Sequence, residues 1–203
     1  VGDQYANESG AGIELNYEYR GIERGYPFHY NCKISYHLKT GNELTIATNI
    51  INTDEGLIPV QDGWHPYFTF GGKIDDLQLE FQSKEMVVFD ESLIPTGNVV
   101  PYQEFGSLKK IGSAIIDNCF TLNFAECQPL CVLRDAGKKL QIEVRPGKHY
   151  PYLQIYTPLH RNSIAIENLS APPDAFNNKM DLIILQPGEN IIFTTTYKIT
   201  PLI

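Results

Sequence analysis

Two ionisable residues lie in segments that otherwise resemble apolar or aromatic strands, and together they could perform acid–base chemistry. They are His65, in residues 63–68, and Glu167, in residues 164–169. A carboxylate in an apolar strand is costly to bury unless it is paired or takes part in chemistry. A histidine titrates near neutral pH and can therefore exchange a proton there. Each residue also has a purely structural interpretation. In it, His65 is a core residue whose hydrogen bonds are satisfied, and Glu167 lies at the end of a strand, where it emerges into solvent.

The segment around His65 is expected to be extended and to lie at an edge or an opening. In an extended chain His65 and Tyr67 point to one face, while Trp64 and Pro66 point to the other. Proline has no N–H to donate to a sheet ladder, so it is confined to edges and irregular positions. This placement would leave His65 accessible.

Three further polar residues could line a binding cavity. Asp117 begins a predicted strand, although an aspartate before asparagine is usually a turn residue that caps backbone amides. Gln154 and Tyr156 share one face of another predicted strand. Any β-sandwich would offer such positions, so these residues alone do not identify a site.

The elements that must position these residues are strands, because apolar and polar residues alternate along most of the chain. A turn at residues 40–42 joins two alternating runs into a hairpin, another tight turn is expected at 135–138, and at most a turn or two of helix fits near Ala175. We predict about twelve strands, at residues 13–19, 28–38, 44–50, 65–70, 77–82, 85–90, 119–125, 129–134, 140–145, 153–157, 163–167 and 191–199.

Composition supports an all-β fold in a single domain. Val, Ile, Thr and the aromatic residues number 65 of the 203, against 9 Ala. Strands with short turns and little helix predict an antiparallel β-sandwich. The net charge of −8 argues against nucleic acid and anionic lipid as partners, and the apolar runs are too short to span a membrane. The four cysteines do not form a disulfide scaffold or a zinc motif, so we expect reduced thiols (Cys32, Cys119, Cys127 and Cys131).

Taken in order, these segments resemble the aldose 1-epimerase (galactose mutarotase) family. The resemblance runs from the Gly-Tyr-Pro-Phe of residues 25–28 to the end of the chain. Each motif is weak alone, but their order and spacing are specific. The motifs are His-x-Tyr-Phe at 65–68, Asp-Asn at 117–118, Leu-Gln-x-Tyr-Thr at 153–157, Glu167 followed by Pro-Asp-Ala-x-Asn at 173–177, Leu-Gln-Pro-Gly-Glu at 185–189 and Thr-Tyr at 196–197.

The resemblance implies a galactose mutarotase-like supersandwich, of which residues 1–203 would be the central and C-terminal part. The family normally begins with further strands that supply an Asn/Arg pair and a second His, and no motif here matches that portion. We therefore expect a cleft open on one side, weak activity from these residues alone, and possible self-association through exposed sheet edges. Trp64-His65-Pro66 replaces the Asn-His-Ser of galactose-acting members, which indicates a different branch.

The resemblance also implies the chemistry, which is interconversion of the α and β anomers of a hexose. Glu167 would be the base at the C1 hydroxyl and His65 the acid at the ring oxygen, and no metal or redox cofactor is needed. Asp117 would accept hydrogen bonds from sugar hydroxyls. Residue type suggests Trp64 or Tyr156 for stacking on the sugar. The expected partner is a small sugar in the cytoplasm.

Two other functions remain open from the sequence. One is a carbohydrate-binding β-sandwich without catalysis. The other is a glycoside hydrolase, which would need the carboxyl groups of Asp117 and Glu167 about 5–9.5 Å apart. An epimerase acting on a phosphosugar would need an Arg/Lys cluster, and only Arg161 lies near a motif.

Overall fold

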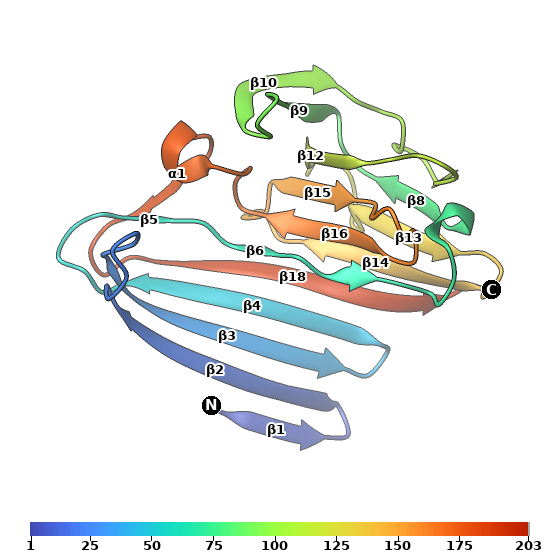
Figure 1. Cartoon of the computed structure of the whole chain (residues 1–203). Helices are drawn as coiled ribbons and strands as arrows, with labels where there is room; N and C mark the ends of the chain where they lie inside the picture. Colours follow the sequence, from blue (N-terminus) through green and yellow to red (C-terminus); the bar gives the residue numbers. More distant parts are fainter. Residues whose placement is uncertain (203) are drawn as a thin grey trace.

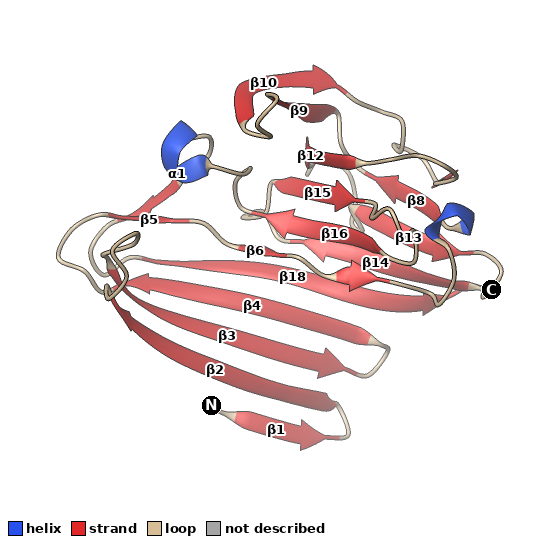
Figure 2. Cartoon of the chain, viewed as in Figure 1, coloured by secondary structure: helices blue, strands red, loops and turns tan. Residues whose placement is uncertain are grey.

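The computed structural model describes residues 1–202 as two large antiparallel sheets with one small two-stranded sheet beside them (Figures 1 and 2). The nine-stranded sheet has the order β1 (Gln4–Asn7), β2 (Gly10–Arg20), β3 (His29–Lys39), β4 (Glu43–Asn52), β18 (Asn190–Pro201), β14 (Leu140–Pro146), β13 (Cys131–Asp135), β8 (Gln78–Phe81) and β11 (Lys109–Lys110). The seven-stranded sheet has the order β10 (Pro95–Pro101), β9 (Glu85–Phe89), β12 (Asp117–Thr121), β15 (Tyr152–Tyr156), β16 (Ile164–Leu169) and β6 (Gly63–Trp64), with β7 (Tyr67–Phe68) also paired to β16.

The predicted all-β class is confirmed, and helix within residues 1–202 is limited to two single turns. These are the 3-10 turn Ile74–Asp76 and α1 (Ala175–Asn178), the latter at the predicted place. The predicted hairpin forms between β3 and β4, and the turn at 135–138 joins β13 to β14. Six strands were not predicted by alternation, and each is short, proline-containing or exposed. They are β1, β5 (Ile58–Val60), β6, β10, β11 and β17 (Ile183–Leu185).

The main core lies between the two large sheets. Alternate residues of the seven-stranded sheet, including Phe120, Leu153 and Ile166, pack against residues of the nine-stranded sheet such as Phe81 and Leu133. Period-two alternation therefore sends the intervening side chains of β12, β15 and β16 to the opposite face, away from the nine-stranded sheet.

A buried polar contact ties β16 to the nine-stranded sheet. Asn168 is fully buried, and its Nδ2 donates to Thr195 Oγ1 on β18 at 2.6 Å. A buried amide must find a partner. This requirement fixes where β16 lies relative to β18 and so fixes the residues that β16 presents on its other face.

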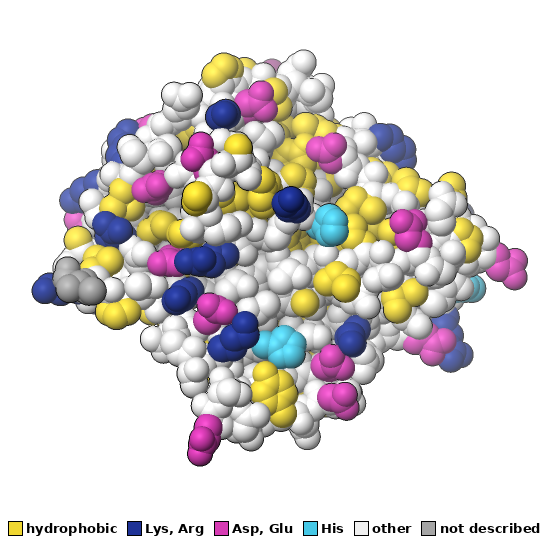
Figure 3. Space-filling model, turned by 180° about the vertical axis from the view of Figure 1, so that it is seen from behind, with side chains coloured by type: hydrophobic (Ala, Val, Ile, Leu, Met, Phe, Trp, Pro, Cys, Tyr) yellow, Lys and Arg dark blue, Asp and Glu magenta, His cyan; other side chains and the backbone are white. Residues whose placement is uncertain are grey.

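One outer face of the molecule is mixed in charge. The face opposite to that of Figure 1 carries acidic and basic side chains interspersed with apolar ones (Figure 3). At one sheet edge, β1 lies with all four residues exposed and adds no side chain to the core. No helix within residues 1–202 has the length and apolar character to cross a membrane.

Phe120→Ala should lower the free energy of unfolding by about 3–5 kcal/mol, because it removes a fully buried ring from the inter-sheet core. The ring packs 4.7 Å from Phe81 and 4.6 Å from Tyr102, between centroids. Urea denaturation measures the change. Ile22→Ala, at a side chain that is 76% exposed, is the control and should change stability little. Equal effects of the two substitutions would contradict this assignment of the core.

Candidate active site

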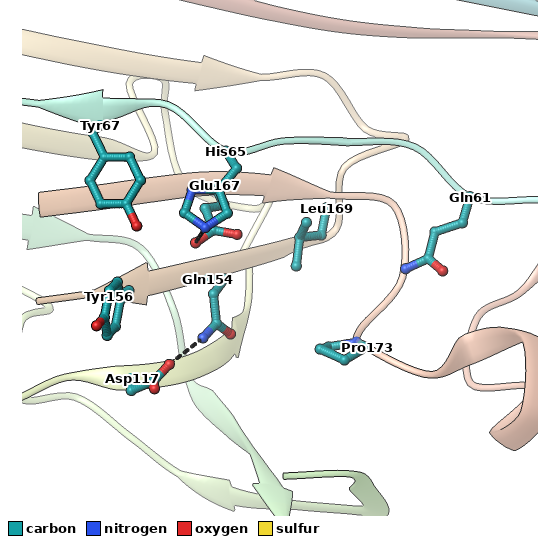
Figure 4. A pocket seen from close by; sticks show the side chains of 9 residues that line it. All are labelled: Gln61, His65, Tyr67, Asp117, Gln154, Tyr156, Glu167, Leu169 and Pro173. Carbon is teal, nitrogen blue, oxygen red and sulfur yellow. Dashed lines mark hydrogen bonds and ion pairs between the residues drawn. The ribbon is translucent and has the colours of Figure 1, made fainter. Parts of the chain in front are cut away.

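Three neighbouring strands and one edge segment place polar side chains in register on the outer face of the seven-stranded sheet. Glu167 on β16 pairs with Gln154 on β15, which pairs in turn with Cys119 on β12. On the other side of β16, the segment between β6 and β7 brings His65 to Glu167. His65, Glu167 and Gln154 form one row across the sheet, with His65 at its edge (Figure 4).

Glu167 is buried and paired with His65. Its carboxylate Oε1 lies 3.2 Å from His65 Nε2, and only 7% of the residue is exposed. Burial raises the pKa of the Glu167 carboxyl above its ordinary value, while His65 acts to lower it and the Asp117 carboxylate to raise it. The structural interpretation in which Glu167 emerges into solvent is therefore wrong.

His65 is not a core residue. Its side chain is about half exposed, and its ring stacks on that of Tyr67 with centroids 5.0 Å apart and 26° between the planes. The strand is interrupted at Pro66, whose carbonyl accepts from Ile166 N at 3.3 Å. The predicted edge position is confirmed, because among the described strands this segment pairs with β16 alone.

Asp117 and Gln154 form a second polar contact on the same face. Gln154 Nε2 donates to Asp117 Oδ1 at 3.0 Å, and Gln154 Oε1 is buried without a hydrogen-bond partner. Asp117 is exposed at the start of β12. An unpaired acceptor beside an exposed carboxylate is suited to receive hydroxyl groups.

These side chains surround a cavity of about 460 Å³ (Figure 4). Sequence reasoning did not select Gln61, Leu169 or Pro173 as lining residues. Gln61 could have been predicted from the sequence, because it precedes His65 by four residues and therefore lies on the same face of an extended chain. The lining residues are Gln61, His65, Tyr67, Asp117, Gln154, Tyr156, Glu167, Leu169 and Pro173.

Trp64 does not line this cavity, which corrects its selection as a stacking residue. Alternation turns it to the face opposite His65, where it packs on a second core cluster that includes Tyr150 and Phe193. Its ring meets that of Tyr36 edge-on, with centroids 6.0 Å apart. The structure thus brings together His65, Glu167, Asp117 and Tyr156 but not Trp64.

Comparison with known families agrees with this arrangement. A sequence model for Aldose 1-epimerase matches residues 3–198. The chain belongs to the aldose 1-epimerase family. The matched region begins well before residue 25, so the family likeness also covers β1 and β2, where the motifs gave no resemblance.

Individual relatives share low sequence identity with this chain. The Escherichia coli K12 protein YihR, described as uncharacterized, is 28% identical over 174 residues, which cover 81% of this chain and 54% of YihR. The chain thus spans about half the length of that curated relative.

Solved structures share the fold at low sequence identity. A galactose mutarotase-like protein from Clostridium acetobutylicum superposes with a TM-score of 0.88 at 17% identity, covering 100% of this chain and 66% of that one. Galactose 1-epimerase from Lactobacillus acidophilus gives 0.82 at 19% identity, covering 99% of this chain and 66% of that one. The mutarotase-like supersandwich expected from the sequence is confirmed.

Glu167→Gln should be at least as stable as the wild type at pH 8, because it removes a buried charge. A carboxyl whose pKa is raised on folding favours the protonated folded state, so the wild type loses stability as pH rises through the folded-state pKa. The variant's advantage should therefore shrink as pH falls toward the ordinary carboxyl range. Urea denaturation between pH 4 and 8 measures this, with Glu91→Gln as the exposed control. A variant less stable than wild type at pH 8 would contradict the inferred cost of burial.

Proposed function

We propose that this chain is an aldose 1-epimerase that interconverts the anomers of a neutral aldohexose by opening and closing its ring. The observation that carries the proposal is the direct contact of His65 with Glu167, at 3.2 Å, beside the cavity. The C1 hydroxyl oxygen and the ring oxygen are bonded to the same carbon. An acid and a base that serve these two oxygens must therefore be neighbours, as His65 and Glu167 are.

The reaction begins with Glu167 ionised and His65 protonated. Glu167 removes the proton of the C1 hydroxyl, and the electrons of that O–H bond form the C1 carbonyl. The bond between C1 and the ring oxygen breaks, and His65 donates its proton to that oxygen. The open-chain aldehyde rotates about C1–C2, and the reverse transfers close the other anomer. Both residues return to their starting states, so no proton is gained or lost overall.

Burial makes Glu167 better suited to this role. A carboxylate with a raised pKa binds a proton more readily than a solvated one, so it is the stronger base. Its contact with His65 opposes this rise and favours the charged form of Glu167. In a plot of kcat/KM against pH, the rising limb should therefore lie at higher pH than the ordinary pKa of a glutamate would give.

The lining of the cavity favours a neutral sugar. Its nine residues include no lysine or arginine that would pair with a phosphate. Arg161, near the last motifs, donates to Asp75 and to the carbonyls of Gly112 and Ala114 instead. Asp117 and Gln154 would receive hydroxyl groups, and Tyr156 would pack on the apolar face of the ring.

The two alternative functions differ in measurable ways. Asp117 lies two strands from Glu167 and two residues out of register with it, and the direct partner of Glu167 is a histidine. A hydrolase would instead rely on the two carboxyl groups. A binding module would bind sugar without accelerating mutarotation.

Glu167→Gln and His65→Asn should each slow mutarotation by about 10²–10⁴-fold, because each removes one proton transfer. Polarimetry of freshly dissolved α-glucose and α-galactose, corrected for the spontaneous rate, measures the effect. Sugar binding should survive in both variants. Glu91→Gln and His37→Asn, remote from the cavity, are the matched controls. Wild-type rates in either active-site variant would overturn the assigned roles.

Asp117→Asn should raise KM more than it lowers kcat, because Asp117 is proposed to hold hydroxyl groups in both the ground and the transition state. Initial mutarotation rates over a range of α-glucose concentrations separate the two constants. A collapse of kcat at unchanged KM would instead place Asp117 in proton transfer and favour the hydrolase.

A further inference from the structure

A second cavity lies over the face of β3 and β4 that carries Tyr30 and Thr48. Residues 60–62, which follow β5, and helix α1 form its other walls (Figure 1). Its volume is about 280 Å³, just below the ~300–1,000 Å³ typical of sites for drug-sized molecules. The cavity is therefore large enough for a small ligand only.

Three aromatic rings line this cavity, and two of them meet the third at nearly a right angle. The Tyr26 ring lies edge-on to the Tyr30 ring, with centroids 5.9 Å apart and 83° between the planes. It meets the Phe176 ring of α1 in the same way, at 6.0 Å and 88°. The Tyr26 hydroxyl donates to the carbonyl of Pro59 at 2.6 Å, which holds the ring in place. Aromatic rings arranged around a small space attract a cation electrostatically.

A carboxylate lines the same cavity and has no cationic partner in the described chain. The Oδ2 of Asp62 accepts from the Tyr150 hydroxyl at 2.5 Å. Burial raises the pKa of the Asp62 carboxyl, while its hydrogen bonds act to lower it. Within residues 1–202, no lysine, arginine or histidine forms an ion pair with Asp62. A buried carboxylate is costly without a compensating charge, and a bound cation would supply that charge.

A buried hydroxyl adds a second polar group to the cavity wall. Thr48, on β4, lines the cavity and is only 2% exposed. It lies near enough to favour the charged form of Asp62, yet among the described residues its Oγ1 has no partner of hydrogen-bond geometry. A buried polar group without a partner is uncommon in a native structure and requires an explanation. A ligand with several N–H donors could bond to Thr48 and Asp62 together.

We propose that this second cavity binds a small primary ammonium ion, such as a protonated alkylamine. The ammonium group donates to Asp62 and Thr48, and its charge lies against the three aromatic rings. A neutral molecule of the same size gains neither the ion pair nor the cation–π attraction. A quaternary ammonium ion has no N–H and leaves Thr48 unpaired. The inference does not depend on the proposed function, because His65 and Glu167 take no part in it.

The test compares the affinities of n-propylammonium and 1-propanol by saturation-transfer NMR titration at pH 8. In the wild type the ammonium ion should bind about tenfold more tightly than the alcohol, since a charge-assisted hydrogen bond and cation–π contacts together are worth at least that factor. Asp62→Asn keeps the shape of the side chain but removes its charge, so it should abolish the preference. Asp3→Asn, at an exposed position, is the matched control and should keep the preference.

Phe176→Leu supplies a second variant that leaves the carboxylate in place. The Phe176 side chain is 39% exposed, so the fold should tolerate the change, which urea denaturation checks. Leucine keeps an apolar wall but has no ring face. The substitution should therefore weaken n-propylammonium binding about twofold to fivefold and leave 1-propanol binding unchanged.

Three results would overturn this site. The first is equal affinity of the wild type for n-propylammonium and 1-propanol, and the second is a preference that survives Asp62→Asn. The third is displacement of n-propylammonium by an equal concentration of potassium ions, which would make the cavity a site for inorganic cations. None of these readouts measures mutarotation, so the outcome is independent of the proposed function.

Discussion

The burial of the Glu167 carboxylate constrains the rest of the structure. A charge in the middle of a sheet destabilises the fold unless a partner lies close by, and here the partner is the imidazole of His65 at 3.2 Å. The same contact has a chemical consequence, because it places a carboxyl group of raised pKa beside an imidazole, as the proposed mechanism requires. Burial of this pair lowers the stability of the fold, and such a loss is common where the buried groups serve a function.

The sheet architecture makes the pair possible. β16 lies between β15 and the edge segments β6 and β7, so Glu167 is flanked on both sides. On the opposite face of β16, the contact of Asn168 with Thr195 holds the strand against β18. Pro66 interrupts the edge strand beside His65, and the imidazole is therefore both anchored and accessible.

Alternation in the sequence predicted the sheet class and the residues that share a face, such as His65 with Tyr67 and Gln154 with Tyr156. It could not predict which strands pair, because the contact of His65 with Glu167 joins residues 102 positions apart. That convergence was expected only from the family resemblance. Residue type misplaced Trp64, since a ring that can stack on a sugar can equally pack in a core. Local alternation also could not predict the pairing partners of proline-containing strands such as β5 and β10.

The most direct test of the central claim is a crystal structure of the Glu167→Gln variant with glucose bound. The account predicts the C1 hydroxyl within hydrogen-bonding distance of residue 167 and the ring oxygen within the same reach of His65 Nε2. Asp117 and Gln154 should contact hydroxyl groups on other carbons. A sugar whose C1 lies against Asp117, or whose ring oxygen points away from His65, would contradict the account.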